Sequence, residues 1–530
     1  MENSKKINGT DPVLIVGGSL VGLSAAAFLA WKNVPVILVE KHRGSSLHPR
    51  AVGYTTRTIE LFRSIGIEDK LPKNQKHFQL RRAKVKSLAG ELIEETEWTP
   101  GKKKESVFSD TDYSPVQAVA IAQDGLEPIL RTRALELGAD LRLGTEMISF
   151  HQNDEAVTAV VKERDSGKEY TINASYMIAA DGSESPVREA LRIARKGRGL
   201  MNVVRSVLFR ASLDEYLESG ISQFEIEQPN LKAFLTTYRD GRWVLMFTDD
   251  VDRNEEETMT AIRQAIGRAD IPVEIITKGR WDLSALITDQ FKDGRIFLAG
   301  DSAHTLPPTR GGFGANTGIH DVHNLAWKLA AVTQKASGPE LLFTYQQERW
   351  PVAWNRYQQT FIRPDYAKFA KQEDLQGVKI FDDIGMELGQ LYRSAAVIGA
   401  GEDLPLVKRP DEWNGQPGTR ALHVWLNKNG ERISSHDLFQ KDWVLITENK
   451  NWCSTFQKVT QKTQVKGTCV LLGEDIVPEI IEDFRRTYGI GPTGASLIRP
   501  DGYVACRWED IPAAHEQIFE AAFRQVSFSI

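Results

Sequence analysis

Cysteine is scarce in this chain. Only three of the 530 residues are cysteines, namely Cys453, Cys469 and Cys506, and no two of them form a Cys-x-x-Cys pair. Such an odd and sparse set argues against a disulfide framework and against a zinc site. It also fits a reducing compartment, so we expect a cytoplasmic protein.

Long apolar runs and a strong net charge are missing as well. No stretch of about 18 apolar residues occurs, so we expect neither a membrane-spanning helix nor a membrane partner. The N-terminal segment MENSKKINGTDP is polar and lacks the apolar centre of a secretory signal. The net charge of −5 is small for this length and predicts no nucleic-acid partner. The ordinary 41% hydrophobic and 26% charged content indicates a globular protein with about two to four domains.

A strand, a glycine-rich loop and a helix follow one another within residues 295–332. Residues 296–299 are apolar, as in a short buried strand, and Asp301 follows at the strand's carboxyl end, where open α/β sheets bind ligands. Three glycines within residues 311–314 allow the backbone to approach a large flat group. Apolar residues then recur at helical spacing, and the N-terminus of such a helix favours an anionic or electron-rich group.

A second glycine turn lies near the N-terminus. The apolar strand 13–16 precedes the turn GGSLVG, a helix and a further strand that ends at Glu40. This order is typical of a dinucleotide-binding unit, in which the terminal acid holds ribose hydroxyls. The second glycine of the G-x-G-x-x-G pattern is replaced by Ser19. Only one such unit is visible, so we expect one permanently bound dinucleotide.

The segment PPTRGGFGANTG closely resembles the second flavin-contacting motif of the class A flavoprotein monooxygenases, the para-hydroxybenzoate hydroxylase-like enzymes. It is most similar to the branch that acts on aromatic polyketides and other phenols. The resemblance implies noncovalently bound FAD, transient NAD(P)H, and hydroxylation by O2 through a flavin C4a-hydroperoxide. Baeyer–Villiger oxygen insertion or antibiotic inactivation is the alternative within this class. A flavin-dependent halogenase would need a Trp-x-Trp-x-Ile-like stretch, which we do not find, and a non-catalytic interaction module is disfavoured because the acids at the three motifs are intact.

The resemblance also implies roles for individual residues. Asp301 would bind the ribityl chain, and Asp181, within the run AADGSESPVR, would serve both flavin and nicotinamide. Arg50 would reach the pyrophosphate, and Gln123 the ribityl or phosphate part. The expected cofactor-binding residues are Gly17, Ser19, Leu20, Val21, Gly22, Glu40, Lys41, Arg50, Gln123, Asp181, Asp301, Pro308, Gly311, Gly314, Ala315 and Asn316.

The catalytic group in the substrate pocket is not identified by the sequence. Tyr238 and Arg242 are the candidates that the presumed substrate domain offers. Glu127, one helical turn after Gln123, is expected to be a surface charge. No metal site is expected.

The expected fold is α/β with α+β elements. It consists of a Rossmann-like FAD-binding domain, an inserted antiparallel-sheet substrate domain, and a C-terminal thioredoxin-like domain without the redox Cys-x-x-Cys. The aromatic-rich helical stretch 354–398 is either core or a lid over a polycyclic substrate. The tail is expected to pack against the rest or to support a homodimer. The expected ranges are 11–80, 110–200 and 285–400 for the FAD domain, 81–109 and 201–284 for the substrate domain, and 401–530 for the tail.

Overall fold

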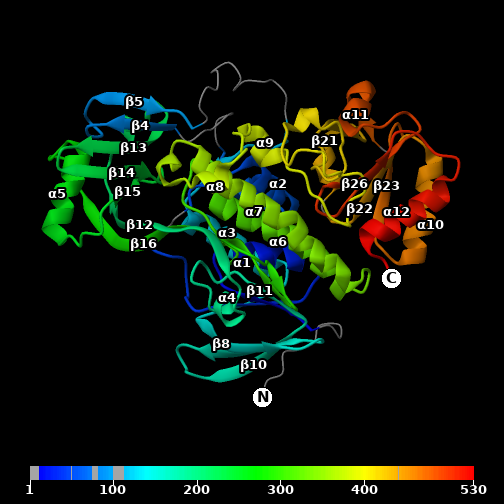
Figure 1. Cartoon of the computed structure of the whole chain (residues 1–530), viewed down its shortest axis with the longest axis horizontal. Coiled ribbons are helices and arrows are strands. Elements are labelled where there is room, and N and C mark those ends of the chain that lie inside the picture. Colours follow the sequence, from blue (N-terminus) through cyan, green and yellow to red (C-terminus); the bar gives the residue numbers. More distant parts are fainter. Residues whose placement is uncertain (1–10, 49–50, 74–80, 99–112, 440, 475) are drawn as a thin grey trace.

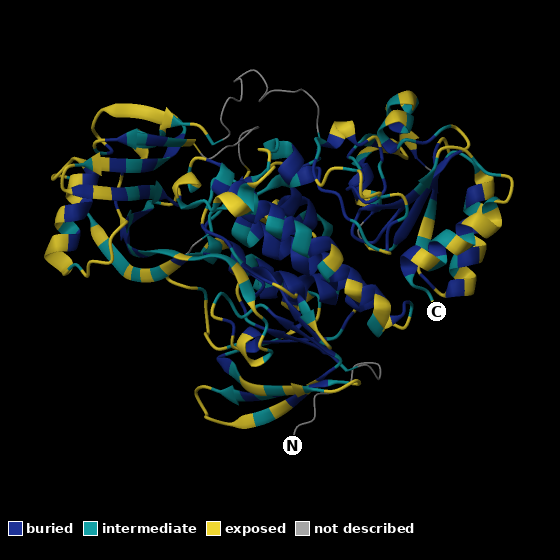
Figure 2. Cartoon of the chain, viewed as in Figure 1, coloured by how far each residue is buried: buried dark blue, intermediate teal, exposed yellow. Residues whose placement is uncertain are grey.

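A computed structural model describes residues 11–48, 51–73, 81–98, 113–439, 441–474 and 476–530 (Figure 1). Three sheet-containing parts surround the long helices α6 (Phe313–Thr333) and α7 (Thr344–Ile362). Figure 2 shows that burial is densest around these two helices, and α6 is buried on nearly all sides. The same three parts are the ones that the sequence predicts.

A six-stranded sheet carries the first part. Its strand order is β17-β18-β11-β1-β2-β7, parallel except for the edge strand β17. The strands are β1 (Val13–Val16), β2 (Val36–Glu40), β7 (Asp140–Leu143), β11 (Tyr176–Ala179), β17 (Lys292–Asp293) and β18 (Ile296–Leu298). The central strands VLIV and YMIA are buried throughout, as expected for parallel strands covered on both faces.

Helices and a small meander enclose this sheet. α1 (Leu20–Trp31) packs against β1 and β2 and also against α3 (Gln123–Glu136) and α6. The antiparallel meander of β8 (Thr145–Gln152), β9 (Val157–Glu163) and β10 (Glu169–Ala174) shares the same hydrophobic core. Smaller elements nearby are β3 (Gly53–Tyr54), α2 (Thr56–Ser64), β6 (Val119–Ala120) and α4 (Pro186–Ala190).

The second part is an eight-stranded sheet, seen on the left of Figure 1, with the order β19-β16-β12-β15-β14-β13-β4-β5. Its pairs are antiparallel except β13 with β4. One face packs Trp243 and Leu245 against α5 (Glu255–Ile266), whereas Leu208 and Val244 on the other face contact Ala122 of the first part. The strands are β4 (Arg81–Val85), β5 (Leu92–Thr96), β12 (Arg195–Arg210), β13 (Ile221–Gln228), β14 (Leu231–Thr237), β15 (Arg242–Phe247), β16 (Glu274–Thr288) and β19 (His304–Thr305).

The aromatic-rich stretch after residue 354 begins as core. Tyr357 and Phe361 of α7 are buried and lie in the core of the first part, so the packing interpretation is confirmed for them. Trp354 is half-buried and stacks on Tyr357 with 4.9 Å between ring centroids. The chain continues through α8 (Gln372–Leu375) and α9 (Asp383–Leu388). Whether this continuation acts as a lid stays a prediction.

The third part has the strand order of a thioredoxin fold. β22 (Trp443–Thr447) pairs in parallel with β23 (Gly467–Leu471) and antiparallel with β25 (Ala495–Ile498), which pairs with β26 (Val504–Trp508). Two helices, α10 (Lys450–Thr463) and α12 (His515–Ser527), cover one face, and α11 (Ile481–Tyr488) covers the other. A small sheet of β20 (Trp425–Lys428), β21 (Glu431–Ser434) and β24 (Val477–Pro478) flanks them.

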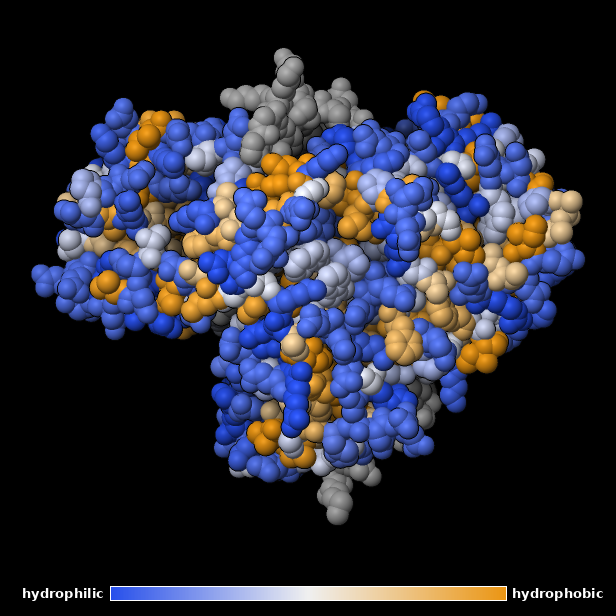
Figure 3. Space-filling model, in the orientation of Figure 1, coloured by the Kyte–Doolittle hydropathy of each residue, from blue (hydrophilic) through white to orange (hydrophobic). Residues whose placement is uncertain are grey.

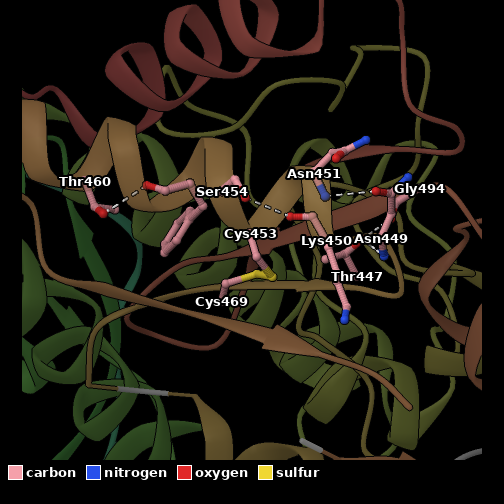
Figure 4. The surroundings of a disulfide bond; sticks show 10 residues. Thr447, Asn449, Lys450, Asn451, Cys453, Ser454, Thr460, Cys469 and Gly494 are labelled. Carbon is pink, nitrogen blue, oxygen red and sulfur yellow. Dashed lines mark hydrogen bonds between the residues drawn. A yellow bond between two sulfur atoms is a disulfide. The ribbon is translucent and has the colours of Figure 1, made fainter. Parts of the chain in front are cut away.

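The sparse cysteines argued against a disulfide framework, but two of them are paired. Cys453 and Cys469 form a disulfide, shown in Figure 4, with their Cα atoms 5.3 Å apart. Cys453 lies in the first turn of α10 and Cys469 on β23, so the parallel β22–α10–β23 crossover brings together residues that the sequence separates. Cys506 is free and buried. The cysteine argument for a reducing compartment therefore no longer holds.

The surface is that of an ordinary globular protein. On the face shown in Figure 3, apolar residues form separate patches among hydrophilic ones. Within the described ranges, no helix combines the length and the apolar character that crossing a membrane would need.

Candidate functional site

The glycine turn after β1 is held by Glu40. One carboxylate oxygen of Glu40 accepts the Gly18 N–H at 2.6 Å, and the other accepts the His42 N–H at 2.8 Å. A side chain at Gly17 would place its Cβ 2.2 Å from the Ala180 carbonyl oxygen, so this position requires glycine. The turn is thereby fixed against the end of β11. Each carboxylate oxygen has a further lone pair, so Glu40 can brace the turn and still accept a ribose hydroxyl.

Ser19 is tolerated at a glycine position because its hydroxyl has a partner within the protein. It donates to Glu127 Oε1 at 2.6 Å, and Gln123 Nε2 donates to both Ser19 Oγ and Glu127 Oε1 at 2.9 and 2.8 Å. The expectation that Glu127 is a surface charge is wrong, because only 2% of it is exposed. The four-residue spacing from Gln123 already places both on one face of α3. Which face that is depends on the packing of α3 against α1, which the sequence does not show.

The first and second glycine motifs meet at Val21. A Cβ on Gly300 would lie 2.8 Å from Val21 Cγ2, and a Cβ on Gly318 would lie 2.6 Å from the same atom. The start of α1, the 3₁₀ turn Gly300–Ser302 and the first turns of α6 therefore converge on one point. Asp301 lies on that 3₁₀ turn and is half-buried.

Asp181 follows β11 at the neighbouring strand end. Its Oδ2 accepts the Val187 N–H at 3.1 Å, near the start of α4. Its Oδ1 is buried and has no hydrogen-bond partner among the described residues. Burial raises the pKa of the Asp181 carboxyl, and hydrogen bonds from Ser185 and Val187 oppose the shift. An orphaned buried oxygen at this place fits contact with a bound group.

Hydrogen bonds of the Asn316 side chain fix the start of α6. Its amide nitrogen donates to the carbonyl oxygens of Gly53 and Gly312 at 3.1 and 2.8 Å, and its Oδ1 accepts from the Thr55 N–H at 3.0 Å and the Thr58 hydroxyl at 2.6 Å. The side chain therefore has no capacity left for a ligand. The main-chain N–H groups at the start of the helix, which carries no acidic residue in its first turn, supply the positive end.

A fully buried cluster of ionisable side chains stabilises the 3₁₀ turn that carries Asp301. Asp321 Oδ2 lies 2.5 Å from His304 Nε2 and accepts the Gly300 N–H at 3.2 Å, while Arg349 Nε donates to Asp321 Oδ1 at 2.7 Å. Burial alone would raise the pKa of Asp321, but His304 and Arg349 outweigh it and lower the pKa to about 2. The ionised Asp321 thus fixes both the strand end and the helix that follows.

The loop between Asp301 and α6 is joined to the eight-stranded sheet. Arg310 donates to the Thr96 carbonyl oxygen and to Asp365 Oδ1, the latter at 2.9 Å. Arg82 of β4 lies 3.2 Å from the same Asp365 oxygen, and the Tyr366 hydroxyl donates to the Pro308 carbonyl oxygen at 2.7 Å. Sequence reasoning missed Arg82 and Asp365, because isolated charged residues in loops and edge strands carry no pattern. Tyr366 belongs to the aromatic-rich stretch 354–398, but its contact with Pro308 was not predicted.

Of the two catalytic candidates, Arg242 is the less plausible in the structure. Arg242 uses its guanidinium on Asp124 at 2.6 and 3.1 Å and on Asp240 at 2.6 Å, so it is committed to protein carboxylates. Tyr238 is 6% exposed, and burial raises the pKa of its hydroxyl. Arg50 lies outside the described residues. No catalytic base is assigned.

The arrangement fits FAD in its chemistry. Glu40 stands where the adenosine ribose is expected, the glycine turn and the start of α1 offer N–H groups for pyrophosphate, and the start of α6 faces the same region as Asp301. Buried oxygens of Ser45, Asp181 and Thr309 have no partner within the described ranges, as groups reserved for a ligand would.

Comparison with known proteins decides the family. A model described as an FAD binding domain matches residues 10–360, and one described as the C-terminal part of aromatic-ring hydroxylases matches residues 414–526. The chain belongs to the FAD-dependent aromatic-ring hydroxylases. As a member of this family it is an FAD-dependent monooxygenase, and the sequence-based family, fold class and cofactor are confirmed. The roles of the single cofactor-binding residues stay predictions.

Several aromatic-ring hydroxylases are similar over nearly their full length. The chain is 36% identical over 538 residues to 4-methyl-5-nitrocatechol 5-monooxygenase of a Burkholderia species, covering 97% of each chain. It is 36% identical to tetracenomycin A2 monooxygenase-dioxygenase of Streptomyces glaucescens, covering 94% of each. The crystal structure of aklavinone-11 hydroxylase with FAD and aklavinone superposes with a TM-score of 0.87 at 32% identity, covering 98% of this chain and 99% of that one.

Proposed function

We propose that this enzyme hydroxylates a phenolic or polycyclic aromatic substrate of the polyketide type, consuming NAD(P)H and O2. The observation that carries the proposal is the placement of Asp301 and the start of α6 beside a loop that is tied to the eight-stranded sheet through Asp365. Similar proteins named for tetracenomycin and aklavinone support the substrate class. Baeyer–Villiger insertion or antibiotic inactivation is the alternative chemistry.

When bound, FAD would supply the redox chemistry, accepting a hydride from NAD(P)H and activating O2 for transfer of one oxygen atom. The chain's own residues bind and orient it. In this proposal Glu40 accepts from the ribose hydroxyls, Asp301 accepts from the ribityl chain, and the start of α6 stabilises negative charge at the pyrimidine edge. NAD(P)H has no second glycine turn to occupy, so it binds only transiently.

The substrate is proposed to lie against the face of the eight-stranded sheet that turns toward the FAD-binding part. Leu208 and Val244 near the centre of this face are buried against Ala122, and the half-buried Met246 beside them is an apolar residue that a substrate could reach. Toward β4 it becomes polar, where Arg82 lies over the Phe234 ring at 4.8 Å and donates to Gln223. An apolar centre with a cationic edge suits a ring system that carries ionisable hydroxyls.

The test measures the flavin content, the substrate-stimulated oxidation of NAD(P)H and the structure of the product. Purified enzyme should be yellow, and a panel of phenols and aromatic polyketides should stimulate NAD(P)H oxidation together with O2 uptake. Mass spectrometry should find one added oxygen atom, and NMR should place it on a ring carbon rather than in a new lactone. A lactone product would support the Baeyer–Villiger alternative, and no stimulation across the panel would contradict the proposed substrate class.

Association and location complete the proposal. We infer a homodimer that works in the cytoplasm without a nucleic-acid or membrane partner. The small net charge of −5 supports only the absence of a nucleic-acid partner. Sedimentation of the FAD-loaded enzyme measures the association state directly, and a monomer at micromolar concentration would contradict the dimer.

A further inference from the structure

A buried ion cluster joins the thioredoxin-like part to α2. Glu60 of α2 is 1% exposed and receives Arg420 Nε at 2.9 Å on one oxygen and Arg420 Nη2 on the other. Arg57, one turn earlier on α2, donates to Glu60 at 2.9 Å and to the Asp501 carbonyl oxygen at 3.1 Å. Both arginines are nearly fully buried. A guanidinium fork on a buried carboxylate fixes distance and orientation together.

The charges in this cluster are well defined. Burial would raise the pKa of Glu60, but the guanidiniums of Arg420 and Arg57 outweigh it, so the pKa lies well below its usual range and Glu60 is ionised. Burial, with Arg420 beside it, lowers the pKa of His436 far below its usual value, so His436 is neutral. One carboxylate therefore holds two guanidiniums, and the loss of Glu60 would leave two buried positive charges without compensation.

The other side of α2 contacts the start of α6. The Thr58 hydroxyl, two residues before Glu60, donates to Asn316 Oδ1 at 2.6 Å, and its oxygen lies 3.0 Å from His320 Nε2. Burial lowers the pKa of His320, so the ring is neutral and its single proton suits Nε2, which donates to Thr58. Asn316 in turn donates to the Gly312 carbonyl oxygen in the glycine loop. The backbone of α2 joins Glu60 to Thr58, so side-chain contacts and this helix together connect Arg420 to that loop.

We propose that Arg420 is a positioning residue through which the C-terminal domain sets the flavin-facing loop, acting on Glu60, then Thr58, then Asn316. The inference rests on the proposed placement of the isoalloxazine at the start of α6. A second buried cluster, in which Arg499 meets Glu348 at 2.6 Å, also joins the C-terminal part to the rest. It holds α7 and, through Lys328, the far half of α6, so it does not provide this path.

The test measures the spectrum and the reduction rate of the bound flavin rather than the stability of the protein. Arg420→Gln removes the fork, and Arg420→Lys keeps the charge but not the two-point contact. We expect both FAD-loaded variants to change the visible circular dichroism of the bound flavin, Arg420→Lys less than Arg420→Gln. The anaerobic rate of flavin reduction by NAD(P)H should fall by about tenfold to a hundredfold, the loss that a displacement of roughly an ångström produces. Thr58→Val, which breaks the contacts to Asn316 and His320 but leaves those of Arg420, should reproduce the flavin changes without lowering the stability of the C-terminal part.

Asp437→Asn is the matched control. Arg63 Nε of the same helix donates to Asp437 Oδ1 of the C-terminal part at 3.0 Å, but this pair is half-exposed and lies at the end of α2 away from Thr58. Its loss should leave the flavin dichroism unchanged. Folded Arg420 variants with a wild-type flavin spectrum and reduction rate would overturn the inference, and so would an equal effect of Asp437→Asn. If Arg420→Gln fails to fold, Arg420→Lys decides alone.

The dichroism measurement separates this inference from the proposed function. It needs neither NAD(P)H nor an aromatic substrate. A wild-type enzyme that binds FAD but oxidises no member of the substrate panel would contradict the proposed substrate class, while the comparison of flavin spectra would still test Arg420.

Discussion

At the scale of one residue, Glu127 is the buried carboxylate that allows a serine to occupy a glycine position in the turn after β1. Ser19 adds a hydroxyl to the phosphate-binding turn, and that hydroxyl is directed to Glu127 at 2.6 Å. We predict that Glu127→Ala lowers the free energy of unfolding by about 1–3 kcal/mol and weakens FAD binding, because the Ser19 hydroxyl and the Gln123 amide lose their carboxylate acceptor. Thermal unfolding and FAD titration measure both effects.

The matched control for that prediction lies on the same helix. Glu136 pairs with Arg133 at 2.9 Å, but its side chain is 43% exposed and the pair is screened by solvent, so Glu136→Ala should leave the free energy of unfolding nearly unchanged. Equal effects of the two substitutions would show that Glu127 has no special role at the glycine turn.

Asp301 is the residue on which the flavin assignment depends most. Asp301→Ala removes the acceptor proposed for the ribityl hydroxyls, so the FAD dissociation constant should rise about tenfold to a hundredfold, as for a lost hydrogen bond to a charged group. Fluorescence titration of the apoprotein measures it. Asp289→Ala, at an acid whose side chain is 51% exposed, should leave the constant unchanged. Full flavin occupancy and unchanged activity in Asp301→Ala would refute the assignment.

At the scale of elements, the sequence predicted what depends on local pattern. The strand VLIV, the glycine turn and the long helix after the glycine loop are all present, because apolar runs and helical spacing act within a few residues. It did not predict that Asn316 turns its side chain to Gly53, or that Asp365 links two arginines. These contacts join elements distant in the chain, and no local pattern records them.

The disulfide is the clearest contact that the sequence analysis failed to predict. Cys453 and Cys469 are 16 residues apart in sequence, and only the crossover through α10 brings them together. Reduction, or Cys453→Ser, should lower the stability of the C-terminal part by about 3 kcal/mol, the loop-closure contribution for this spacing. Turnover by the folded enzyme should stay nearly unchanged, because this pair lies outside the proposed site.

Calorimetry in the presence and absence of a dithiol measures the stability change. Cys506→Ala serves as the control that leaves the disulfide intact. A folded variant without any of the three cysteines that has lost all activity would contradict a structural role for the pair.

For the whole molecule, the C-terminal part is bound into the FAD-binding part rather than appended to it. Trp327 of α6 lies within its hydrophobic core and meets Trp443 edge-to-face at 5.9 Å. The sequence predicted a packed tail but could not show where it packs. We predict that truncation before Gly418 destabilises the enzyme, because Trp327 and Glu60 would lose their partners. Soluble expression and thermal unfolding of the truncated chain test this, and wild-type stability would contradict it.

The last prediction concerns how substrate controls the cofactor. In the proposed function, NAD(P)H finds only one glycine turn in the described part of the chain, and that turn is assigned to FAD. Hydride transfer would then need a flavin position open to solvent, whereas oxygen transfer would need a shielded one. Substrate can shift the balance between two such positions only if it prefers one of them. We therefore predict that a phenol-bearing aromatic substrate accelerates anaerobic flavin reduction at least about tenfold, equivalent to roughly 1.4 kcal/mol of preference. Stopped-flow reduction with and without substrate measures this, with an aromatic hydrocarbon of the same ring size but no hydroxyl as control.

Gly312→Val should slow reduction more than it weakens FAD binding, because Gly312 has a φ of +60° and a Cβ there would meet Asn316 at 2.9 Å. Equal reduction rates across a broad panel of phenols and polyketides would contradict control by substrate while leaving FAD binding intact.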